Sequence, residues 1–509
     1  MMRTASTAAG VIVEPTSLDT RVEDAVVSFA SARLPVVLES SLQRGPYARF
    51  TILACDPVEI VSLDVLDPQC PFEALAECMR QYPSAPAMSS DLPFVGAWIG
   101  YFSYEAGLTI EQIKRTTRRD VGLPQLRFGL YDTAAVFDHA DGRWSLVAVD
   151  WPRGFGLKRA SAHARLAAMR ERLSLFDGGR QGMNAPWRQP WGTRITGRFE
   201  SPTSEEVGHP EEVGHPGEAP ATKAPAANMS YRDYVAKVRR AKRYIEAGDV
   251  YQVNLTQRFT TRTDASPIDL YRRLRQESPS SHAALLLWDD KAVISSSPEL
   301  FLELRDGRVV TRPIKGTRPR GGDPTTDAAE RRRLTESEKD RAELNMIVDL
   351  LRNDLGRVCS FGSVRVVHPG EIEEHPTVFH RVATIEGRLD PKRDWLDLLK
   401  AACPGGSITG APKIRAMQII NELEPTERGV YCGSIGLIGL DGSMSLNIAI
   451  RTMVQIGDVV HLHAGGAIVA DSEPEAEYEE LLAKAAGMMR AVGCGQPDEC
   501  RAALKAPAS

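Results

Sequence analysis

One stretch, Pro313-Ile314-Lys315-Gly316-Thr317-Arg318-Pro319-Arg320, follows a strand-like run from Phe301 to Thr311 and precedes a polar loop that contains proline and glycine. Its two prolines restrict the backbone, and Gly316 lets a ligand approach closely. Its two arginines, together with Arg312, surround Lys315 with positive charge. That charge suits an anionic substrate and favours the neutral, nucleophilic form of the lysine. A basic surface turn would contain the same residues, so the interpretation depends on the rest of the chain.

The composition is that of a large, water-soluble globular protein. At 509 residues the chain exceeds what a single hydrophobic core usually organises, so we expect two domains or one two-lobed unit. The net charge of −5 gives no indication of nucleic acid or an anionic membrane as partner, and no apolar run is long enough to span a bilayer. Eight cysteines without a CxxC pair indicate reduced thiols and a cytoplasmic protein.

Composition and periodicity divide the chain into five parts. Residues 1–24 are expected to be irregular, and residues 493–509 to form a tail. Residues 25–178 alternate strand-like and helical runs, which predicts an α+β lobe, and residues 230–492 form a second lobe. Residues 179–229 are rich in glycine, proline, alanine and glutamate. They cannot bury enough apolar surface to fold, so they are predicted to be a flexible linker.

A helix predicted from about Lys339 to Val358 carries a carboxylate on its apolar side. At about 100° per residue, Glu343 lies in the middle of the apolar arc, and Asp340 lies one turn before it on the same side. An ionised carboxylate that faces a core is costly unless it is paired or bound to a metal. A buried ion pair and a ligand site explain Glu343 equally well from this helix alone.

A second predicted helix has the same feature. It begins at Glu475, where Ser472 and Glu475 resemble a capping box. Glu477 lies on its apolar side, Glu480 flanks that side, and Lys484 follows one turn later. Glutamates in a first turn also suit the helix dipole, but Glu480 lies too far into the helix for that role. Oxygen ligands without histidine or cysteine favour Mg²⁺, so the two helices together predict a magnesium site.

A hairpin with Asp441-Gly442 as its turn is predicted between these helices. Alternation along its second strand, Ser443 to Gln455, puts a row of small and polar side chains that ends in Arg451 on one face. A guanidinium can hold a carboxylate through two hydrogen bonds, so this face is a candidate floor for an anion pocket. A solvent-facing sheet surface is the alternative.

Seven motifs in the second lobe carry a family resemblance. They are Gly248 to Leu255, Ser297 to Glu299, Pro313 to Arg320, Asp340 to Asp354, Gly406 to Lys413, Cys432 to Gly436 and Asp471 to Glu480. Together they resemble the chorismate-utilising enzymes, strongly over residues 230–490 and more loosely over residues 25–178. The resemblance implies an α+β fold of the anthranilate synthase component I type. Such a fold has two lobes, with antiparallel sheets packed face to face and helices outside.

Residues at two positions distinguish the reactions that members of this family catalyse. Members that add water have lysine where this chain has Gln252, so Gln252 implies ammonia as the nucleophile. Anthranilate synthases usually have alanine in place of Lys315. A lysine there resembles the branch that makes 4-amino-4-deoxychorismate for 4-aminobenzoate and folate, and is implied to attack C2 of chorismate covalently. The alternatives are anthranilate formation and, more remotely, a non-catalytic subunit that binds chorismate or tryptophan.

The resemblance also implies a role for each candidate residue. Glu299 would be the general acid for the departing C4 hydroxyl, and His380 would polarise the leaving-group region. Glu343 and Glu480, with Glu477 in or beside their shell, would hold Mg²⁺ against the ring carboxylate. The remaining substrate contacts are assigned to Gln252, Gly316, Thr317, Thr409, Tyr431, Arg451, Gly465, Gly466 and Lys484.

The family pattern implies a separate glutamine amidotransferase subunit as the source of ammonia. The chain has no nucleophile-elbow cysteine followed by His-x-Glu, as a built-in glutaminase of class I would require. Leu38-Glu39-Ser40 resembles the tryptophan-binding segment of anthranilate synthases, so Glu39 and Ser40 form a second candidate site. The chain departs from the family at Ala467, where a third glycine is common, and this departure puts backbone contacts to the substrate at Ala467 in doubt.

Overall fold

The computed structural model describes residues 9–42, 49–64, 67, 69–85, 92–152, 155–175 and 225–494. The predicted linker lies outside these ranges except for its last residues, and so does the predicted tail from residue 495 onward. Within the described ranges all cysteines are free thiols. No helix in the same part of the chain is long and apolar enough to cross a membrane.

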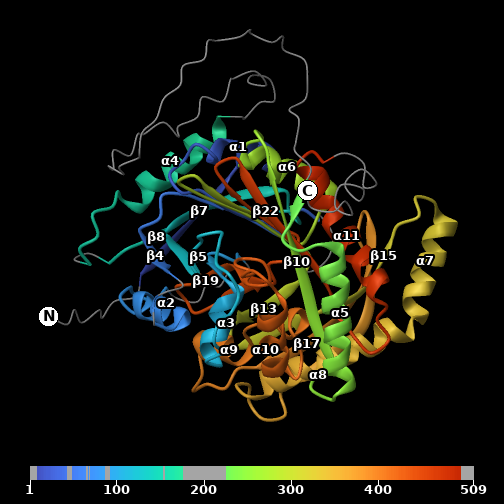
Figure 1. Cartoon of the computed structure of the whole chain (residues 1–509). Helices are drawn as coiled ribbons and strands as arrows, with labels where there is room; N and C mark the ends of the chain where they lie inside the picture. The colour runs from blue at the N-terminus through green and yellow to red at the C-terminus, as the bar shows by residue number, and fades with distance from the viewer. Residues whose placement is uncertain are drawn as a thin grey trace, which may run out of the picture.

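Two antiparallel sheets form the body of the described chain (Figure 1). The first has twelve strands, in the order β1 (Gly10–Thr16), β8 (Arg143–Asp150), β7 (Thr133–Asp138), β3 (Phe50–Ala54), β2 (Val36–Glu39), β11 (His282–Trp288), β12 (Lys291–Ser297), β21 (Thr452–Ile456), β22 (Val459–Ile468), β10 (Gln252–Arg262) and β18 (Gly410–Ala411), with β9 (Ala226–Ala227) paired to β10.

The second sheet has ten strands within the described residues. Their order is β15 (Ile314–Pro319), β17 (Val378–Arg388), β14 (Arg308–Arg312), β13 (Leu300–Arg305), β20 (Met444–Asn447), β19 (Ser434–Gly439), β5 (Ala97–Phe102), β6 (Leu126–Tyr131) and β4 (Glu59–Leu63), with β16 (Arg365–Glu374) paired to β17.

Both sheets combine strands from the two sides of the linker. β2 lies beside β11, with Glu39 opposite Ala283, and β5 lies beside β19. One buried cluster contains Ile52 of the first sheet and Ile99 of the second, so the sheets share a core. The expected α+β class with antiparallel sheets is confirmed. The segment before residue 25 is not irregular throughout, because β1 pairs with β8 and its apolar side chains pack on the core.

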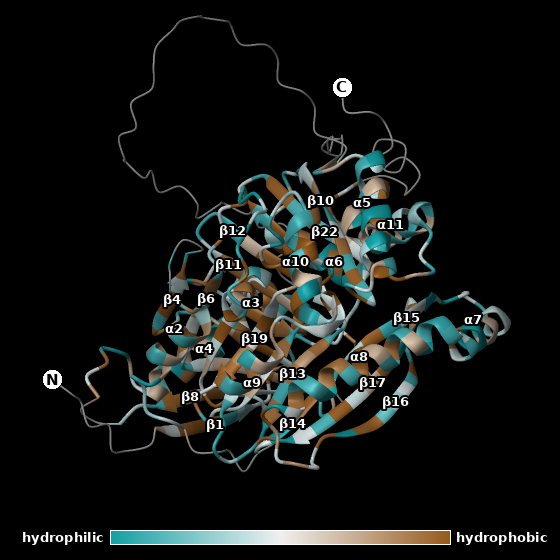
Figure 2. Ribbon diagram, turned by 60° about the horizontal axis from the view of Figure 1, so that its bottom comes forward, coloured by the Kyte–Doolittle hydropathy of each residue, from teal (hydrophilic) through white to brown (hydrophobic). Residues whose placement is uncertain are grey.

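Helices cover the outer faces of the sheets (Figures 1 and 2). α4 packs on β7 and β8, α6 on β12, α10 on β10, and α11 on β22, while α7 and α8 pack on β15 and β17. The helices are α1 (Val22–Phe29), α2 (Pro71–Met79), α3 (Tyr104–Ile110), α4 (Ala162–Ser174), α5 (Tyr231–Glu246), α6 (Pro267–Glu277), α7 (Pro324–Glu336), α8 (Glu338–Gly356), α9 (Trp395–Ala402), α10 (Lys413–Leu423) and α11 (Pro474–Ala491), with a 3₁₀ turn η1 at Gly406–Ile408.

The predicted strand from Ser443 to Gln455 is wrong, because the chain changes sheets within it. β20 ends at Asn447 in the second sheet, and β21 begins at Thr452 in the first. The Asn447 side chain accepts from the Ile435 backbone N–H at 2.9 Å and donates to the His282 carbonyl at 3.0 Å, which ties one strand of each sheet together. Arg451 therefore lies in a crossover rather than at the end of a regular strand face.

The centre of the second sheet leaves no room for a side chain at Gly100. A Cβ there would lie 1.9 Å from the Arg127 carbonyl oxygen and 2.6 Å from the Phe128 Cα. We expect Gly100→Ala to lower the free energy of unfolding by about 3 kcal/mol, measured by chemical denaturation. Gly356→Ala, where a Cβ would meet nothing within 4 Å, is the control. Similar losses in both variants would contradict the steric argument.

Candidate functional site

Lys315 lies in β15 at an edge of the second sheet and reaches the loop around Ser407. Its Nζ donates to the Ser407 carbonyl oxygen at 3.3 Å. Burial lowers the pKa of Lys315; Glu343 opposes this shift, and Lys484 adds to it. A lowered pKa increases the fraction of neutral amine, which is the form that attacks an electrophile.

The predicted arginine environment of Lys315 is wrong. Every arginine of that prediction is held by an acidic side chain, and the cation that acts on Lys315 comes from α11 instead. Arg318 pairs with Asp340 at 3.0 Å, Arg320 pairs with Asp327, and Arg312 pairs with Glu373. Asp340 therefore lies on the inner side of α8 near Glu343, as expected, and its ion pair with Arg318 holds β15 against α8.

Gly316 is required by helix packing. Its φ is +85°, which side chains rarely tolerate. A Cβ there would lie 2.9 Å from Leu334 Cδ1 and 3.0 Å from Asp340 Cβ. The absence of a side chain at Gly316 therefore lets α7 and α8 approach β15, where the sequence suggested the approach of a ligand.

Glu343 lies on the inner side of α8, with 17% of its side chain exposed. Burial raises the pKa of this carboxyl, and the charge of Lys315 opposes the shift. Its ion pair with Lys339, one turn earlier, is long at 3.9 Å. No arginine pairs with Glu343 within the described chain, so a buried Arg–Glu bridge does not explain why the carboxylate faces inward.

The start of α11 differs from the predicted capping box. The Ser472 hydroxyl donates to Glu477 Oε1 at 2.6 Å and accepts from the Val469 backbone N–H at 3.0 Å, and no side chain caps the first turn of the helix. Glu475 instead pairs with Arg239 at 2.8 Å. Glu477 is only 4% exposed, and burial raises its pKa. The serine thus orients a buried carboxylate.

Glu480 and Lys484 lie one turn apart on α11 and pair at 2.7 Å, each about half exposed at 52% and 48%. The Lys484 charge lowers the pKa of Glu480, so this carboxylate stays ionised. Two glycines of β22 face them. Lys484 Nζ donates to the Gly465 carbonyl oxygen at 3.1 Å, and a Cβ at Gly466 would lie 3.7 Å from Lys484 Nζ and 3.9 Å from Glu480 Oε1.

The carboxylates of α8 and α11 fit a divalent cation that also takes substrate oxygens. Glu343 and Glu480 are close enough for the negative charge of Glu480 to raise the pKa of Glu343, a repulsion that a cation would relieve. No group of three histidine, cysteine or acidic side chains in the described ranges forms a ready-made metal site. Two protein carboxylates plus water and substrate oxygens is the arrangement that Mg²⁺ commonly uses.

Glu299 follows β12 and reaches the same place. Its carboxyl bonds to the Ser407 hydroxyl and to the Ile314 backbone, beside Lys315. Burial raises its pKa to about 7, against the opposing effect of these contacts. A carboxyl that keeps its proton near neutral pH can act as a general acid.

A second group of polar side chains surrounds His380 in β17. Its Nδ1 lies 2.8 Å from the Thr317 hydroxyl oxygen, and burial, with the charge of Arg451, keeps the pKa of His380 well below its usual range. Arg451 donates to the Ser278 hydroxyl at 3.2 Å, and burial lowers the pKa of Arg451 to about 10. No carboxylate of the described residues pairs with this guanidinium, so it is suited to bind an anion.

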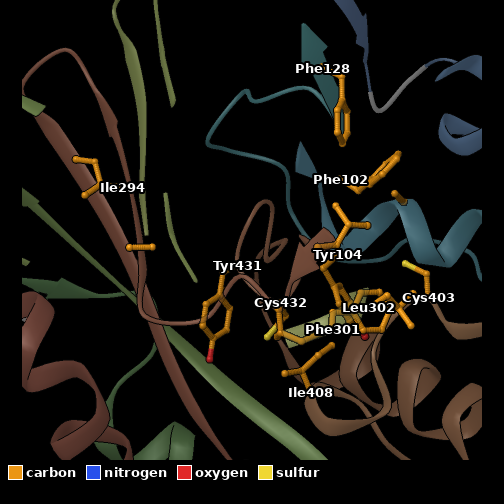
Figure 3. Packing of buried hydrophobic residues seen from close by; sticks show 14 of the residues in the cluster. Phe102, Tyr104, Phe128, Ile294, Phe301, Leu302, Cys403, Ile408, Tyr431 and Cys432 are labelled. Atoms are coloured by element: carbon orange, nitrogen blue, oxygen red, sulfur yellow. The ribbon is translucent and has the colours of Figure 1, made fainter. Parts of the chain in front are cut away.

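Tyr431 and Thr409 are both buried, at 7% and 0% exposed. Tyr431 stacks on His463 with ring centroids 5.0 Å apart, and Figure 3 shows it beside Cys432 in the buried core. Thr409 is fully buried, and its hydroxyl donates to the Gly405 carbonyl oxygen at 3.0 Å. Thr409 therefore holds the η1 loop in place.

Asn254 and Ser407, which the sequence did not single out, connect the η1 loop to β10. Asn254 donates to the Ser407 carbonyl oxygen at 2.8 Å, and its Oδ1 lies 3.4 Å from Gln252 Nε2. The two-residue period of a strand puts both amides on one face of β10, which is a signal available in the sequence. Ser407 carried no such signal, because its role depends on the folded loop.

Glu39 and Ser40 lie away from Lys315 and line a cavity of about 720 Å³ between the sheets. The Glu39 carboxylate accepts hydrogen bonds from Tyr271 and, at 2.8 Å, from Arg275. Burial raises the pKa of Glu39 despite these partners. The cavity extends to Asn447 and to the turn at Asp441-Gly442. The segment that resembles a tryptophan-binding segment therefore faces a cavity large enough for a small ligand.

Comparisons with known proteins show the family of this chain. Residues 38–490 match the model of the chorismate binding enzyme family. The chain is 37% identical over 461 residues to aminodeoxychorismate synthase component 1 of Salmonella typhimurium, covering 88% of this chain and 91% of that protein. It is 38% identical over 459 residues to anthranilate synthase component 1 of Streptomyces coelicolor, with 90% and 83% covered.

A solved structure supports the same assignment. The crystal structure of anthranilate synthase component I from Streptococcus pneumoniae superposes with a TM-score of 0.69 at 31% identity, covering 88% of this chain and 93% of that chain. The aminodeoxychorismate synthase and the anthranilate synthase relatives both match this chain over most of their own length. The chain belongs to the family of chorismate-binding enzymes.

Proposed function

We propose that this protein aminates chorismate at C4 to give 4-amino-4-deoxychorismate, with ammonia as the nitrogen source. One observation carries the proposal: Lys315, a partly buried lysine with a lowered pKa, lies beside Glu299, a carboxyl whose pKa is raised to about 7. A candidate nucleophile and a candidate acid are thus adjacent, and both pKa shifts favour the reactive protonation state. The similarity to aminodeoxychorismate synthase component 1 supports the choice of C4.

The two residues would act in turn. Lys315 Nζ bonds to C2 as the C4 hydroxyl leaves as water with the proton of Glu299, and the resulting secondary ammonium returns a proton to Glu299. Ammonia then bonds to C4, the C2–Nζ bond breaks, and the departing lysine takes a proton from the new ammonium group. Chorismate and ammonia are consumed, and the aminated product and water form. Arg451 and Lys484 would hold the two carboxylates of the substrate.

Mg²⁺ is the proposed cofactor, held by Glu343 and Glu480 with Glu477 beside them. When bound it supplies positive charge to the ring carboxylate of chorismate. Glu477 is oriented by Ser472, and it lies close enough to Glu480 for the charge of Glu480 to raise the pKa of Glu477.

We also propose a separate glutamine amidotransferase partner as ammonia source and tryptophan as ligand of the cavity at Glu39 and Ser40. Folate precursors are the proposed destination of the product.

Anthranilate formation is the main alternative. Anthranilate synthase component 1 of Streptomyces coelicolor is 38% identical to this chain, and aminodeoxychorismate synthase component 1 of Salmonella typhimurium is 37% identical to it. The two reactions start from the same substrates and differ in the carbon that receives nitrogen. Lys315 distinguishes them, since a lysine bonded to C2 blocks amination at that carbon. A purely regulatory subunit would not require the paired pKa shifts of Lys315 and Glu299.

Incubation with chorismate, ammonium and Mg²⁺ tests the reaction directly. We expect 4-amino-4-deoxychorismate by mass spectrometry, and a loss of about 1000-fold in turnover for Lys315→Ala because the nucleophile is gone. Lys291→Ala, at the start of β12, is the control. Anthranilate fluorescence from the parent protein without an added lyase would show that C4 is the wrong site.

The pKa of Glu299 predicts how stability depends on pH. The folded state keeps the proton up to about pH 7, whereas the unfolded carboxyl releases it near its ordinary value of 4.5. The parent should therefore lose up to about 3 kcal/mol relative to Glu299→Gln as the pH rises from 4.5 to 7. Denaturation curves at pH 5 and pH 8 measure the difference, and Glu338→Gln on exposed α8 surface should show none.

Removal of the proposed Mg²⁺ ligand on α8 should change the metal requirement. After dialysis against a chelator, we expect Glu343→Gln to need at least about tenfold more Mg²⁺ for half-maximal activity than the parent. Glu338→Gln, on the exposed face of the same helix, should titrate like the parent. Identical Mg²⁺ titrations for parent and Glu343→Gln would remove Glu343 from the ligand set.

A further inference from the structure

One buried guanidinium connects the η1 loop to β10. Arg428 is 3% exposed, and its Nη1 donates to the Ile408 carbonyl oxygen at 2.9 Å. Its Nη2 donates to the Asn254 carbonyl oxygen in β10 at 3.1 Å. Ile408 directly follows Ser407 in η1, so the guanidinium holds the loop next to the residue that bonds to Lys315.

The guanidinium is itself fixed by its surroundings. The Glu424 carboxylate accepts from Arg428 Nε at 2.8 Å and from Nη2 at 2.7 Å. Glu424 Oε1 also accepts from the Thr256 backbone N–H and hydroxyl, both at 2.9 Å. The Tyr104 ring, in the buried cluster of Figure 3, lies against the guanidinium with 4.5 Å between the ring centroid and Cζ. The Glu105 carboxylate accepts from the Arg428 backbone N–H at 2.8 Å, so both the backbone and the side chain of this arginine are held.

Stability alone does not explain a charge at this position. A buried ion pair is weak evidence of stabilisation, because desolvation of both ions offsets their attraction, and apolar side chains of similar volume often serve as well. What arginine adds is a planar fork of donors that bonds to several acceptors at fixed angles. Here the fork bonds to a carboxylate and to two backbone carbonyls of different elements, so it determines where the η1 loop lies relative to β10.

We propose that Arg428 is a positioning residue: its guanidinium fixes the η1 loop so that Ser407 bonds to Lys315 and Glu299 at the same time. This inference rests on the proposed function, because it gives that arrangement a purpose in amination. Arg428 has no hydrogen bond to either of the two proposed reactive groups in the described chain. It acts through Ser407, whose carbonyl accepts from Lys315 and whose hydroxyl bonds to Glu299.

The Ser407 hydroxyl gives this role a measurable consequence. Burial raises the pKa of Glu299 to about 7, and the hydrogen bond from Ser407 opposes that rise because it favours the ionised carboxyl. The charge of Lys315 also opposes it, whereas the Cys432 thiol is neutral, because burial raises its pKa to about 12. Loss of the Arg428 fork releases Ser407 and therefore raises the pKa of Glu299 further.

The variants Arg428→Lys and Ser407→Ala test the inference. Lysine keeps the positive charge beside Glu424 but has a single nitrogen, so it cannot bond to the carboxylate and both carbonyls in the same geometry. The pKa of Glu299 is measured through stability. The free energy of unfolding of each protein, relative to the same protein with Glu299→Gln, falls as the pH rises above 4.5 and stops changing at the folded pKa. A loss of packing alone would lower stability equally at every pH.

We expect this difference to level off near pH 7 in the parent and at least about half a pH unit higher in Arg428→Lys. Ser407→Ala should shift it in the same direction, and the combined variant no further than the larger single shift. Arg258→Lys is the matched control and should level off with the parent, because Arg258 is also buried but pairs with Asp120, at 2.6 and 2.7 Å. Arg428→Lys should also lower kcat about tenfold or more and leave KM for chorismate within about twofold.

The results separate this inference from the proposed function. A parent protein that makes no aminated product would overturn the proposed function, while the stability shifts still show whether Arg428 fixes Ser407. A difference that levels off near pH 7 in Arg428→Lys, or in Ser407→Ala, would overturn the positioning role, and so would shifts that add in the combined variant. If Arg428→Lys does not fold, Arg428→Met with Glu424→Gln removes both charges and keeps an acceptor for Thr256, and its shift decides instead.

Discussion

Burial of the Lys315 amine is the constraint on which the site depends. A lysine side chain in a low-dielectric place loses hydration, so the neutral amine becomes more favourable. The fold achieves this by closing β15 against α7 and α8, with glycine at position 316 because Leu334 and Asp340 occupy the adjoining space. Acidic partners hold the arginines that flank Lys315 in the sequence, which leaves Lys484 as the cation that adds to the effect of burial.

The η1 loop converts that constraint into an arrangement of reactive groups. Ser407 bonds through its carbonyl to Lys315 and through its hydroxyl to Glu299, so the proposed nucleophile and the proposed acid share one anchor. Thr409 fixes the same loop by bonding to Gly405. Residues distant in the sequence become neighbours because β10 and β15 begin near this loop and β12 ends near it. Small movements of η1 would therefore disturb several groups at once.

The sequence predicted much of this and failed where the cause is tertiary. α8 and the inward carboxylate of Glu343 follow from helical periodicity and could be derived from the residues alone. The sheet change after Asn447 could not, because an alternating pattern looks the same in one strand or two. Nor could the pairing of Ser472 with Glu477, since a hydroxyl near a helix start has several acceptors within reach.

Identical side chains have different roles here because their surroundings differ. Glu299 is buried, and its pKa rises to about 7, so it holds a proton that it can donate. Glu480 lies beside Lys484, and its pKa falls, so it stays an anion that can bind a cation. A sequence shows two glutamates and cannot rank their acidity. Burial and one neighbouring charge make that distinction, and with it they separate the proposed acid from the proposed metal ligand.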